Sequence, residues 1–142
     1  MMKKLLILVM LLISLNAKSI NYEKNDCITQ FVIEWLQTPY KWGGTSKKGI
    51  DCSAYVQKLY RRVFNIEIPR TCVMQYKICK KIKQIELDAG DFIFFRFGEK
   101  WHVGIYLTNG RFTHSGLEHG VWISDLNSQY WQKHYYNSGR IS

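Results

Sequence analysis

The chain has 142 residues, of which 46% are hydrophobic and 15% aromatic, and its formal net charge is +9. This is enough apolar material for one packed domain, and the length excludes two domains of ordinary size. The basic residues are scattered rather than grouped among aromatics, which argues against a nucleic-acid-binding protein and leaves an anionic polymer or lipid surface, or simple solubility, as the reason for the charge.

The first 19 residues have the pattern of a secretory signal peptide: a positive start, an apolar run from Leu5 to Leu15, then small and polar residues. The apolar run is shorter than the roughly 20 residues that cross a bilayer, so we expect no stable membrane insertion. We expect cleavage near Ala17 or Ser19, and a single domain over residues 20–142. The sequence therefore predicts an exported protein of the periplasm or cell envelope, which keeps a charge of +7 when residues 1–17, with their two lysines, are removed.

Three helices are predicted in the first half of the domain. Apolar residues recur at helical spacing from Asp26 to Leu36, with Asp26 as the N-cap and Pro39 just beyond the end. After a loop, Asp51 is the predicted N-cap of a second helix, whose apolar face is Cys52, Tyr55, Val56, Leu59, Tyr60 and Val63. A third, short helix is predicted to start at Thr71.

The second half has the pattern of strands separated by glycine and asparagine turns. The predicted strands are DFIFFRF (91–97), WHVGIYL (101–107), RFTHSG (111–116) and GVWISDL (120–126). A last helix is predicted over 128–136. Helices followed by neighbouring strands predict an α+β domain, in which the helices pack on an antiparallel sheet.

Four cysteines in an exported chain would ordinarily suggest disulfides. Cys72 and Cys79 are seven residues apart, which is about 10.5 Å along a helix and beyond the reach of a disulfide. A pair between Cys27 and Cys79 stays open.

Cys52 has the position of a nucleophile. At the first turn of a helix, the unpaired amides and the helix dipole favour a thiolate. A nucleophilic thiol also needs a histidine base, and the base needs a third polar group to orient it. In the strand that carries His102, Gly104 and Tyr106 share its face.

Whether His114 joins His102 depends on the turn TNG between their strands. A two-residue Asn-Gly loop would pair Ile105 with His114 and separate the histidines. We predict a three-residue loop, with Thr108 and Asn109 in a type I turn and Gly110 as a bulge, because it pairs Gly104 with His114 and makes the histidines diagonal neighbours.

The pattern thus predicts Cys52 as nucleophile, His102 as general base and His114 as the residue that orients the imidazole. The backbone amide of Cys52 and the hydroxyl of Tyr40 are candidate donors to the oxyanion. No CxxC or HxxxH spacing is present, which disfavours a zinc site.

The motifs PYKWGG, GIDCSAYVQ, IPRT, GDFIFF and HVGIYL, with the small-residue strand around His114, resemble the NlpC/P60 family of cell-wall cysteine peptidases from about Thr38 to Arg140. The chain is most similar to the single-domain Spr-type murein endopeptidases. The resemblance implies a papain-like fold and hydrolysis of peptidoglycan stem peptides at γ-D-glutamyl-diaminopimelate or at the D-alanyl-diaminopimelate cross-link. Separately, we expect no cofactor and a monomer.

By motif position, the resemblance assigns catalysis to Cys52, His102 and His114. It assigns oxyanion or substrate contacts to Tyr40, Asp51, Ser53 and Arg70. Where relatives often have serine, this chain has Cys72, a second thiol that either packs passively or oxidises with Cys52.

Other interpretations stay open. Cys52 could be a buried packing residue, the two histidines could be core residues, Asp51 could be only a helix cap, and Arg70 could only pair with a carboxylate. His119 and His134 are predicted to lie on the surface. Besides a peptidase, the fold could serve as a non-catalytic wall-binding module, or as a cysteine transamidase or acyltransferase.

Overall fold

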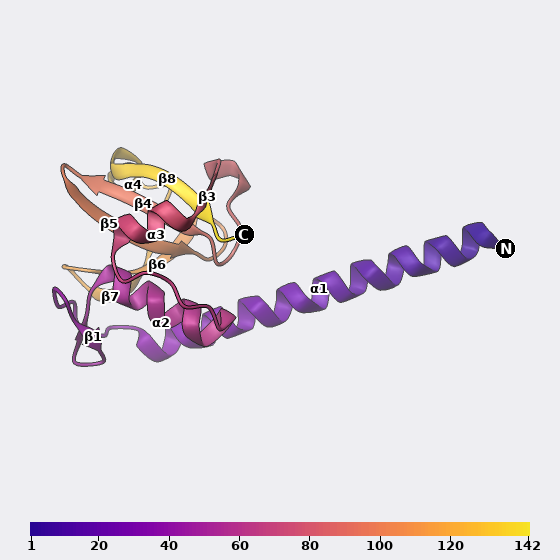
Figure 1. The fold of residues 1–142 in the computed structure, drawn as a ribbon, viewed down its shortest axis with the longest axis horizontal. Helices are drawn as coiled ribbons and strands as arrows, with labels where there is room; N and C mark the ends of the chain where they lie inside the picture. Colours follow the sequence, from indigo (N-terminus) through magenta and orange to yellow (C-terminus); the bar gives the residue numbers. More distant parts are fainter.

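The computed structural model describes residues 1–142 as helices packed on both faces of an antiparallel sheet (Figure 1). Helices α1 (Met2–Trp35), α2 (Cys52–Phe64) and α3 (Cys72–Ile78) contribute to the core on one face, and α4 (Gln129–His134) packs on the other. The strand order is β3-β8-β4-β5-β6-β7, with bounds β3 Lys80–Ile82, β4 Phe92–Phe97, β5 Lys100–Tyr106, β6 Arg111–Gly116, β7 Gly120–Asp125 and β8 Tyr135–Arg140. The remaining elements are a hairpin of β1 (Thr45–Ser46) with β2 (Gly49–Ile50) and the single turn η1 (Gln84–Glu86). This architecture confirms the predicted α+β class.

Helix α1 is one continuous helix whose first part extends away from the sheet (Figure 1). The predicted N-cap at Asp26 is wrong, because no proline or glycine interrupts the helix upstream of it. The Asp26 carboxylate instead accepts a hydrogen bond of 3.2 Å from the Gln30 side chain. Only the end of α1 is packed in the core, through Ile28, Phe31, Val32 and Trp35. By length and composition α1 could cross a membrane, a property that N-terminal signal sequences share.

Helix α2 begins at Cys52, as predicted. The Asp51 side chain accepts a hydrogen bond of 2.8 Å from the amide of Ala54 and so caps the helix. Most of the predicted apolar face is buried, and Val63 packs against it partly exposed. The helix ends at Phe64, because Asn65 adopts a left-handed conformation with φ of 54°.

Two apolar cores lie on opposite faces of the sheet. The larger core joins α1, α2 and α3 to alternate residues of β4 and β5, including Phe92, Phe94, Val103 and Ile105. The smaller core lies on the other face and contains Ile93, Phe95, Phe112 and Leu126, with Trp131 of α4 packed against it. Since successive strand residues point to opposite faces, His102 and His114 belong to the second face.

The turn between β5 and β6 has the predicted register but a different conformation. Ile105 pairs with Thr113, which is the register that places Gly104 opposite His114. Asn109 and Gly110 both have positive φ, 52° and 74°, so they form the centre of a turn like type I′. The predicted type I turn is therefore wrong, because Asn109 tolerates the left-handed region and Thr108 becomes the extra residue.

The C-terminal segment contains a strand that the sequence did not predict. Helix α4 stops at His134, and β8 follows directly, where a helix over 128–136 was expected. The sequence YYNSGR has no alternating apolar pattern, yet β8 pairs with both β3 and β4. The Arg140 guanidinium donates to both oxygens of the Asp91 carboxylate, at 2.8 and 2.7 Å, and holds the strand end in place.

Candidate active site

The start of α2 presents a thiol beside unpaired backbone amides. The first four amides of a helix lack partners within it, and here Asp51 satisfies those of Ala54 and Tyr55 through its side chain and carbonyl. The amides of Cys52 and Ser53 are left at the helix end where the thiol lies. They are positioned to donate to a developing oxyanion.

The two predicted histidines meet across β5 and β6. His102 Nε2 and His114 Nδ1 are 2.9 Å apart, which confirms that the rings share a face. The β5–β6 ladder has only two pairs, Ile105 with Thr113 and Tyr106 with Phe112, so the strands separate where the histidines lie. This separation lets a thiol from the other face of the sheet approach the imidazoles.

A third polar residue, Ser124 of β7, completes the chain of hydrogen bonds. His114 Nε2 lies 2.9 Å from Ser124 Oγ. Burial lowers the pKa of His114 well below its ordinary value, and the neighbouring His102 and His119 act in the same direction, so His114 stays neutral. A neutral His114 that donates to Ser124 must accept from His102 at Nδ1, which leaves His102 Nδ1 as the free proton acceptor.

Several neighbouring groups favour the thiolate of Cys52. The pKa of Cys52 lies well below its ordinary value because the Cys72 thiol donates a hydrogen bond to it and because the His102 ring and the Val103 amide also stabilise the anion. Burial opposes these effects but does not outweigh them. Cys52 is therefore the more acidic partner of the thiol pair.

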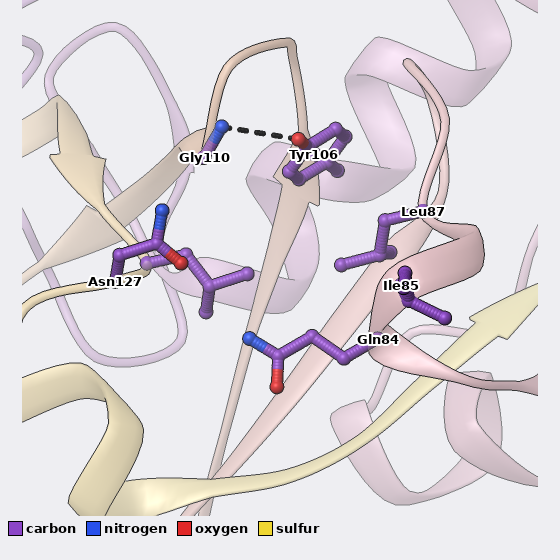
Figure 2. A pocket seen from close by; sticks show the side chains of 7 residues that line it. Gln84, Ile85, Leu87, Tyr106, Gly110 and Asn127 are labelled. Carbon is purple, nitrogen blue, oxygen red and sulfur yellow. Dashed lines mark hydrogen bonds between the residues drawn. The ribbon is translucent and has the colours of Figure 1, made fainter.

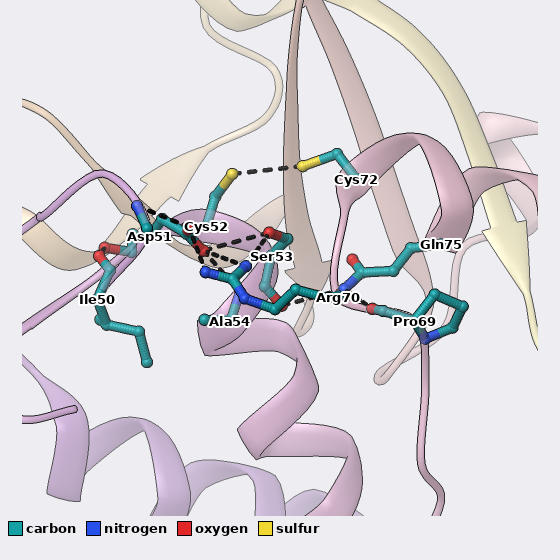
Figure 3. A network of polar contacts seen from close by, with 11 residues as sticks. Ile50, Asp51, Cys52, Ser53, Ala54, Pro69, Arg70, Cys72 and Gln75 are labelled. Carbon is teal, nitrogen blue, oxygen red and sulfur yellow. Dashed lines mark hydrogen bonds and ion pairs between the residues drawn. The ribbon is translucent and has the colours of Figure 1, made fainter. Parts of the chain in front are cut away.

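Cys72 contacts the nucleophile directly. It is the first residue of α3, and its Sγ lies 3.4 Å from Cys52 Sγ (Figure 3). All four cysteines are free in the structure, so Cys27 and Cys79 are not joined. Cys72 and Cys79 lie at opposite ends of α3, as the helix spacing predicts.

Asp51, Ser53 and Arg70 form one polar network beside the thiols (Figure 3). The Arg70 guanidinium donates to both Asp51 carboxylate oxygens, at 2.9 and 2.6 Å, and to Ser53 Oγ at 2.8 Å. The Asp51 carboxylate also accepts from the Ser53 hydroxyl and the Gly43 amide. The network fixes the start of α2 against the loop before α3, and the Arg70 side chain keeps 39% of its surface exposed for a further contact.

Replacing Asp51 with asparagine should lower the unfolding free energy at pH 7 by about 1–3 kcal/mol, because asparagine keeps the helix cap but loses the charged pair with Arg70. Burial raises the pKa of Asp51, but hydrogen bonds from Arg70, Ala54 and Ser53 outweigh it and bring the pKa below 3.8. A lowered pKa adds stability above the unfolded-state value, and this stability is lost as the pH falls through the folded-state value. The difference between the proteins should therefore shrink in acid.

Urea unfolding at pH 7 and at successively lower pH measures this difference. Glu67→Gln is the matched control, because Glu67 pairs with Arg61 at an exposed site, where an ion pair adds little. An Asp51→Asn variant as stable as the parent at pH 7 would contradict the role assigned to the network.

Tyr40 lies at the edge of this site. It bridges to Ile50 in parallel fashion, next to the start of α2. Burial raises the pKa of its hydroxyl, and the negative charges of Cys52 and Asp51 raise it further, so the protonated hydroxyl lies close to both anions. The structure thus groups Tyr40 with the predicted site residues.

The sequence did not predict two residues of the site, Ser124 and Trp131. Ser124 lies two positions from Trp122, the register partner of His114, so the β6–β7 register places it on the histidine face. Trp131 packs against both imidazoles, with ring centroids 5.8 Å from His102 and 4.9 Å from His114. Its position depends on the packing of α4, which local sequence does not show. His134, predicted on the surface, is half-buried and stacks on Phe97.

A separate hollow of about 400 Å³ lies at the far end of β5 (Figure 2). The hydroxyl of Tyr106 accepts a hydrogen bond of 3.0 Å from the Gly110 amide there, which braces the β5–β6 turn. None of its lining residues is a cysteine, histidine, aspartate or glutamate that could act as nucleophile, base or metal ligand. The lining consists of Gln84, Ile85, Leu87, Tyr106, Gly110, Leu126 and Asn127. The thiol–imidazole cluster is therefore the candidate active site.

Comparison with known proteins identifies the family of this sequence. The model of the NlpC/P60 family matches residues 37–140. A "Probable endopeptidase NlpC homolog" of Haemophilus influenzae is 45% identical over 76% of this chain and 58% of its own length. The "Murein DD-endopeptidase MepS/Murein LD-carboxypeptidase" of Escherichia coli K12 is 40% identical over 85% of this chain and 65% of its own length. This chain thus spans less than two thirds of both relatives.

A solved structure has the same fold. A lipoprotein-like NLP/P60 family protein of Staphylococcus aureus superposes with a TM-score of 0.75 at 34% identity, over 84% of this chain and 41% of that protein. The helices that carry the thiols and the sheet that carries the histidines are thus parts of a known architecture.

Proposed function

The chain belongs to the NlpC/P60 family, and from that premise we propose that it is a peptidoglycan hydrolase, a cysteine endopeptidase of stem peptides. The observation that carries the proposal is the hydrogen-bonded pair of His102 and His114 at the start of α2, where the acidic thiol of Cys52 lies. The E. coli relative named as a murein endopeptidase gives the substrate class. The candidate bonds are D-alanyl-diaminopimelate and γ-D-glutamyl-diaminopimelate.

The first half of the reaction forms an acyl-enzyme. His102 Nδ1 takes the proton of Cys52, and the thiolate attacks the carbonyl carbon of the scissile bond. The amides of Cys52 and Ser53, with the Tyr40 hydroxyl, would stabilise the oxyanion. His102 then gives its proton to the leaving amine, and a thioester remains on Cys52.

The second half releases the acyl group. His102 takes a proton from water, and the resulting hydroxide attacks the thioester carbonyl and releases the Cys52 sulfur. The proton then returns to this sulfur, or it stays on His102, which forms an ion pair with the Cys52 thiolate. His114 holds the His102 ring throughout, because its Nδ1 accepts the hydrogen bond from His102 Nε2.

Defined muropeptides test the proposal. The full-length chain, kept soluble with a mild detergent, is incubated with cross-linked and uncross-linked muropeptides, and the products are identified by mass spectrometry. Cleaved cross-links would identify the D-alanyl bond, and shortened uncross-linked stems the γ-D-glutamyl bond. An unchanged substrate that stays bound would favour the non-catalytic wall-binding module, and a product joined to an added amine would favour a transamidase.

We also propose that the protein is exported, since residues 1–19 have the pattern of a signal peptide and the substrate lies outside the cytoplasm. The exposed first part of α1 supports this proposal, because it contributes nothing to the core of the domain. N-terminal sequencing of the protein from an envelope fraction would identify the cleavage site. A start at Met1 in that fraction would contradict cleavage.

Replacing Ser124 with alanine should lower kcat by about 10- to 100-fold with little change in KM, because His114 loses the partner that fixes its tautomer and His102 loses its alignment. Steady-state kinetics on the cleaved muropeptide, with the pH dependence of kcat/KM, measure the effect. Ser124→Thr keeps a hydroxyl and should restore most of the activity. Equal activity of Ser124→Ala and the parent would show that the hydrogen bond to Ser124 positions nothing.

A further inference from the structure

Two thiols from different helices touch in the candidate active site. Cys52 and Cys72 are separated by 20 residues, yet their sulfurs lie 3.4 Å apart (Figure 3). Both residues lie at the edge of the core cluster, and each keeps 8% of its surface exposed. We propose that Cys52 and Cys72 form a dithiol modification site, at which a low-molecular-weight disulfide converts the nucleophile into an internal disulfide.

The geometry requires little movement. A disulfide bond is about 2.05 Å long, so sulfurs that already touch must approach by about 1.4 Å, which rotation of the two side chains can supply. Both residues lie at the first positions of their helices, where Asp51 and Thr71 hold the chain as caps. The fold therefore presents the two thiols to each other before any oxidant arrives.

The chemistry proceeds in two exchange steps. The Cys52 thiolate attacks one sulfur of the reagent disulfide, which forms a mixed disulfide on Cys52 and releases one reagent thiolate. Cys72 then attacks the Cys52 sulfur, forms the internal bond and releases the second reagent thiolate, which takes up the Cys72 proton. Two electrons pass from the protein sulfurs to the reagent, which leaves as one thiolate and one thiol.

The neighbouring charge sets the order of the steps. Cys72 is held as a thiol because its hydrogen bond to Cys52, burial, and the charge of the Cys52 anion all raise its pKa. Once the mixed disulfide has removed the Cys52 anion, the hydrogen bond and the charge no longer hold the proton on Cys72. The first step thus activates the second.

The other two cysteines do not compete for this reaction. Burial raises the pKa of Cys79 to about 12, and its side chain packs against Gly139. Cys27 lies exposed on α1, outside the site. The internal disulfide is therefore specific to Cys52 and Cys72. Its effect on catalysis rests on the proposed function, because a sulfur in a disulfide cannot attack a carbonyl.

Oxidised glutathione is the probe. The reduced full-length chain in mild detergent is treated with it, free thiols are alkylated, and disulfide-linked peptides are mapped by mass spectrometry, with muropeptide cleavage measured in parallel. We expect a Cys52–Cys72 disulfide, complete loss of cleavage, and full recovery with dithiothreitol. Cys72→Ser should stop at the first step and keep one glutathione on Cys52. Cys27→Ser is the matched control, and it should form the Cys52–Cys72 disulfide and lose cleavage as the parent does.

Two results would overturn the proposal: a parent protein that keeps glutathione on Cys52 with Cys72 free, or a disulfide that joins Cys52 to Cys27 or Cys79. The peptide map decides this independently of activity. A reduced parent protein that cleaves no muropeptide would refute the proposed function, while a mapped Cys52–Cys72 bond would still support the modification site.

Discussion

Replacing Cys52 with alanine should abolish muropeptide cleavage, with a fall in kcat on the order of 10⁵-fold or more, because no other group can form the acyl-enzyme. Cys72 should not substitute for it, because burial and the Asp51 charge still raise the pKa of Cys72 in this variant. The His102 ring and the Val103 amide stabilise an anion at Cys52 and are not among the groups that act on Cys72. Product formation, followed by mass spectrometry, measures the loss.

The Cys52→Ala variant should stay folded, because Asp51 still caps α2 and the change removes a single sulfur atom from the site. Circular dichroism and the melting temperature check this point. Cys27→Ala removes an exposed thiol from α1 and is the matched control, which should cleave at the parent rate. Equal product from Cys52→Ala and the parent would end the assignment of Cys52 as nucleophile.

Replacing His102 with alanine should lower kcat by about 10³- to 10⁴-fold, because the reaction loses its general base and acid. The thiolate also loses a stabilising neighbour, since the His102 ring contributes to the lowered pKa of Cys52. The pKa of Cys52 should therefore rise, and the pH at which Cys52 reacts half-maximally with iodoacetamide should move upward. A peptide map after alkylation reports Cys52 separately from the other thiols.

His119→Ala provides the control for this experiment, because His119 lies exposed beside Glu118 and contacts neither thiol. It should leave the alkylation profile of Cys52 in place. An unchanged profile in His102→Ala would show that the imidazole does not stabilise the thiolate. A changed profile with full turnover would separate thiolate stabilisation from proton transfer.

Helix α2 and strands β4 to β7 were predictable because their signals are local. Asp51 before an apolar stripe marks a capped helix, and alternating apolar residues between glycine turns mark strands. The missing break in α1 and the strand β8 were not predictable in the same way. A polar segment such as YYNSGR becomes a strand only because β3 and β4 offer it backbone partners.

The candidate site also contains contacts that local sequence signals predicted and contacts that they did not. The meeting of His102 and His114 followed from the length of one turn, although Asn109 and Gly110 adopt a conformation different from the predicted one. The contact of Cys72 with Cys52 did not follow from spacing, since it depends on how the loop before α3 returns to the start of α2. Arg70 holds this loop against the start of α2 by pairing with Asp51, which lies 19 positions earlier in the chain.

The nucleophile and its base are anchored in different halves of the molecule. Cys52 belongs to the core on the α2 face, and the two imidazoles pack with Trp131 on the opposite face. They meet where β5 and β6 separate, so the packing of both layers on the sheet sets the sulfur–nitrogen separation. Turnover should consequently be more heat-sensitive than the fold itself, because a small slip between layers would disengage the reacting atoms while cooperative unfolding was still some degrees away.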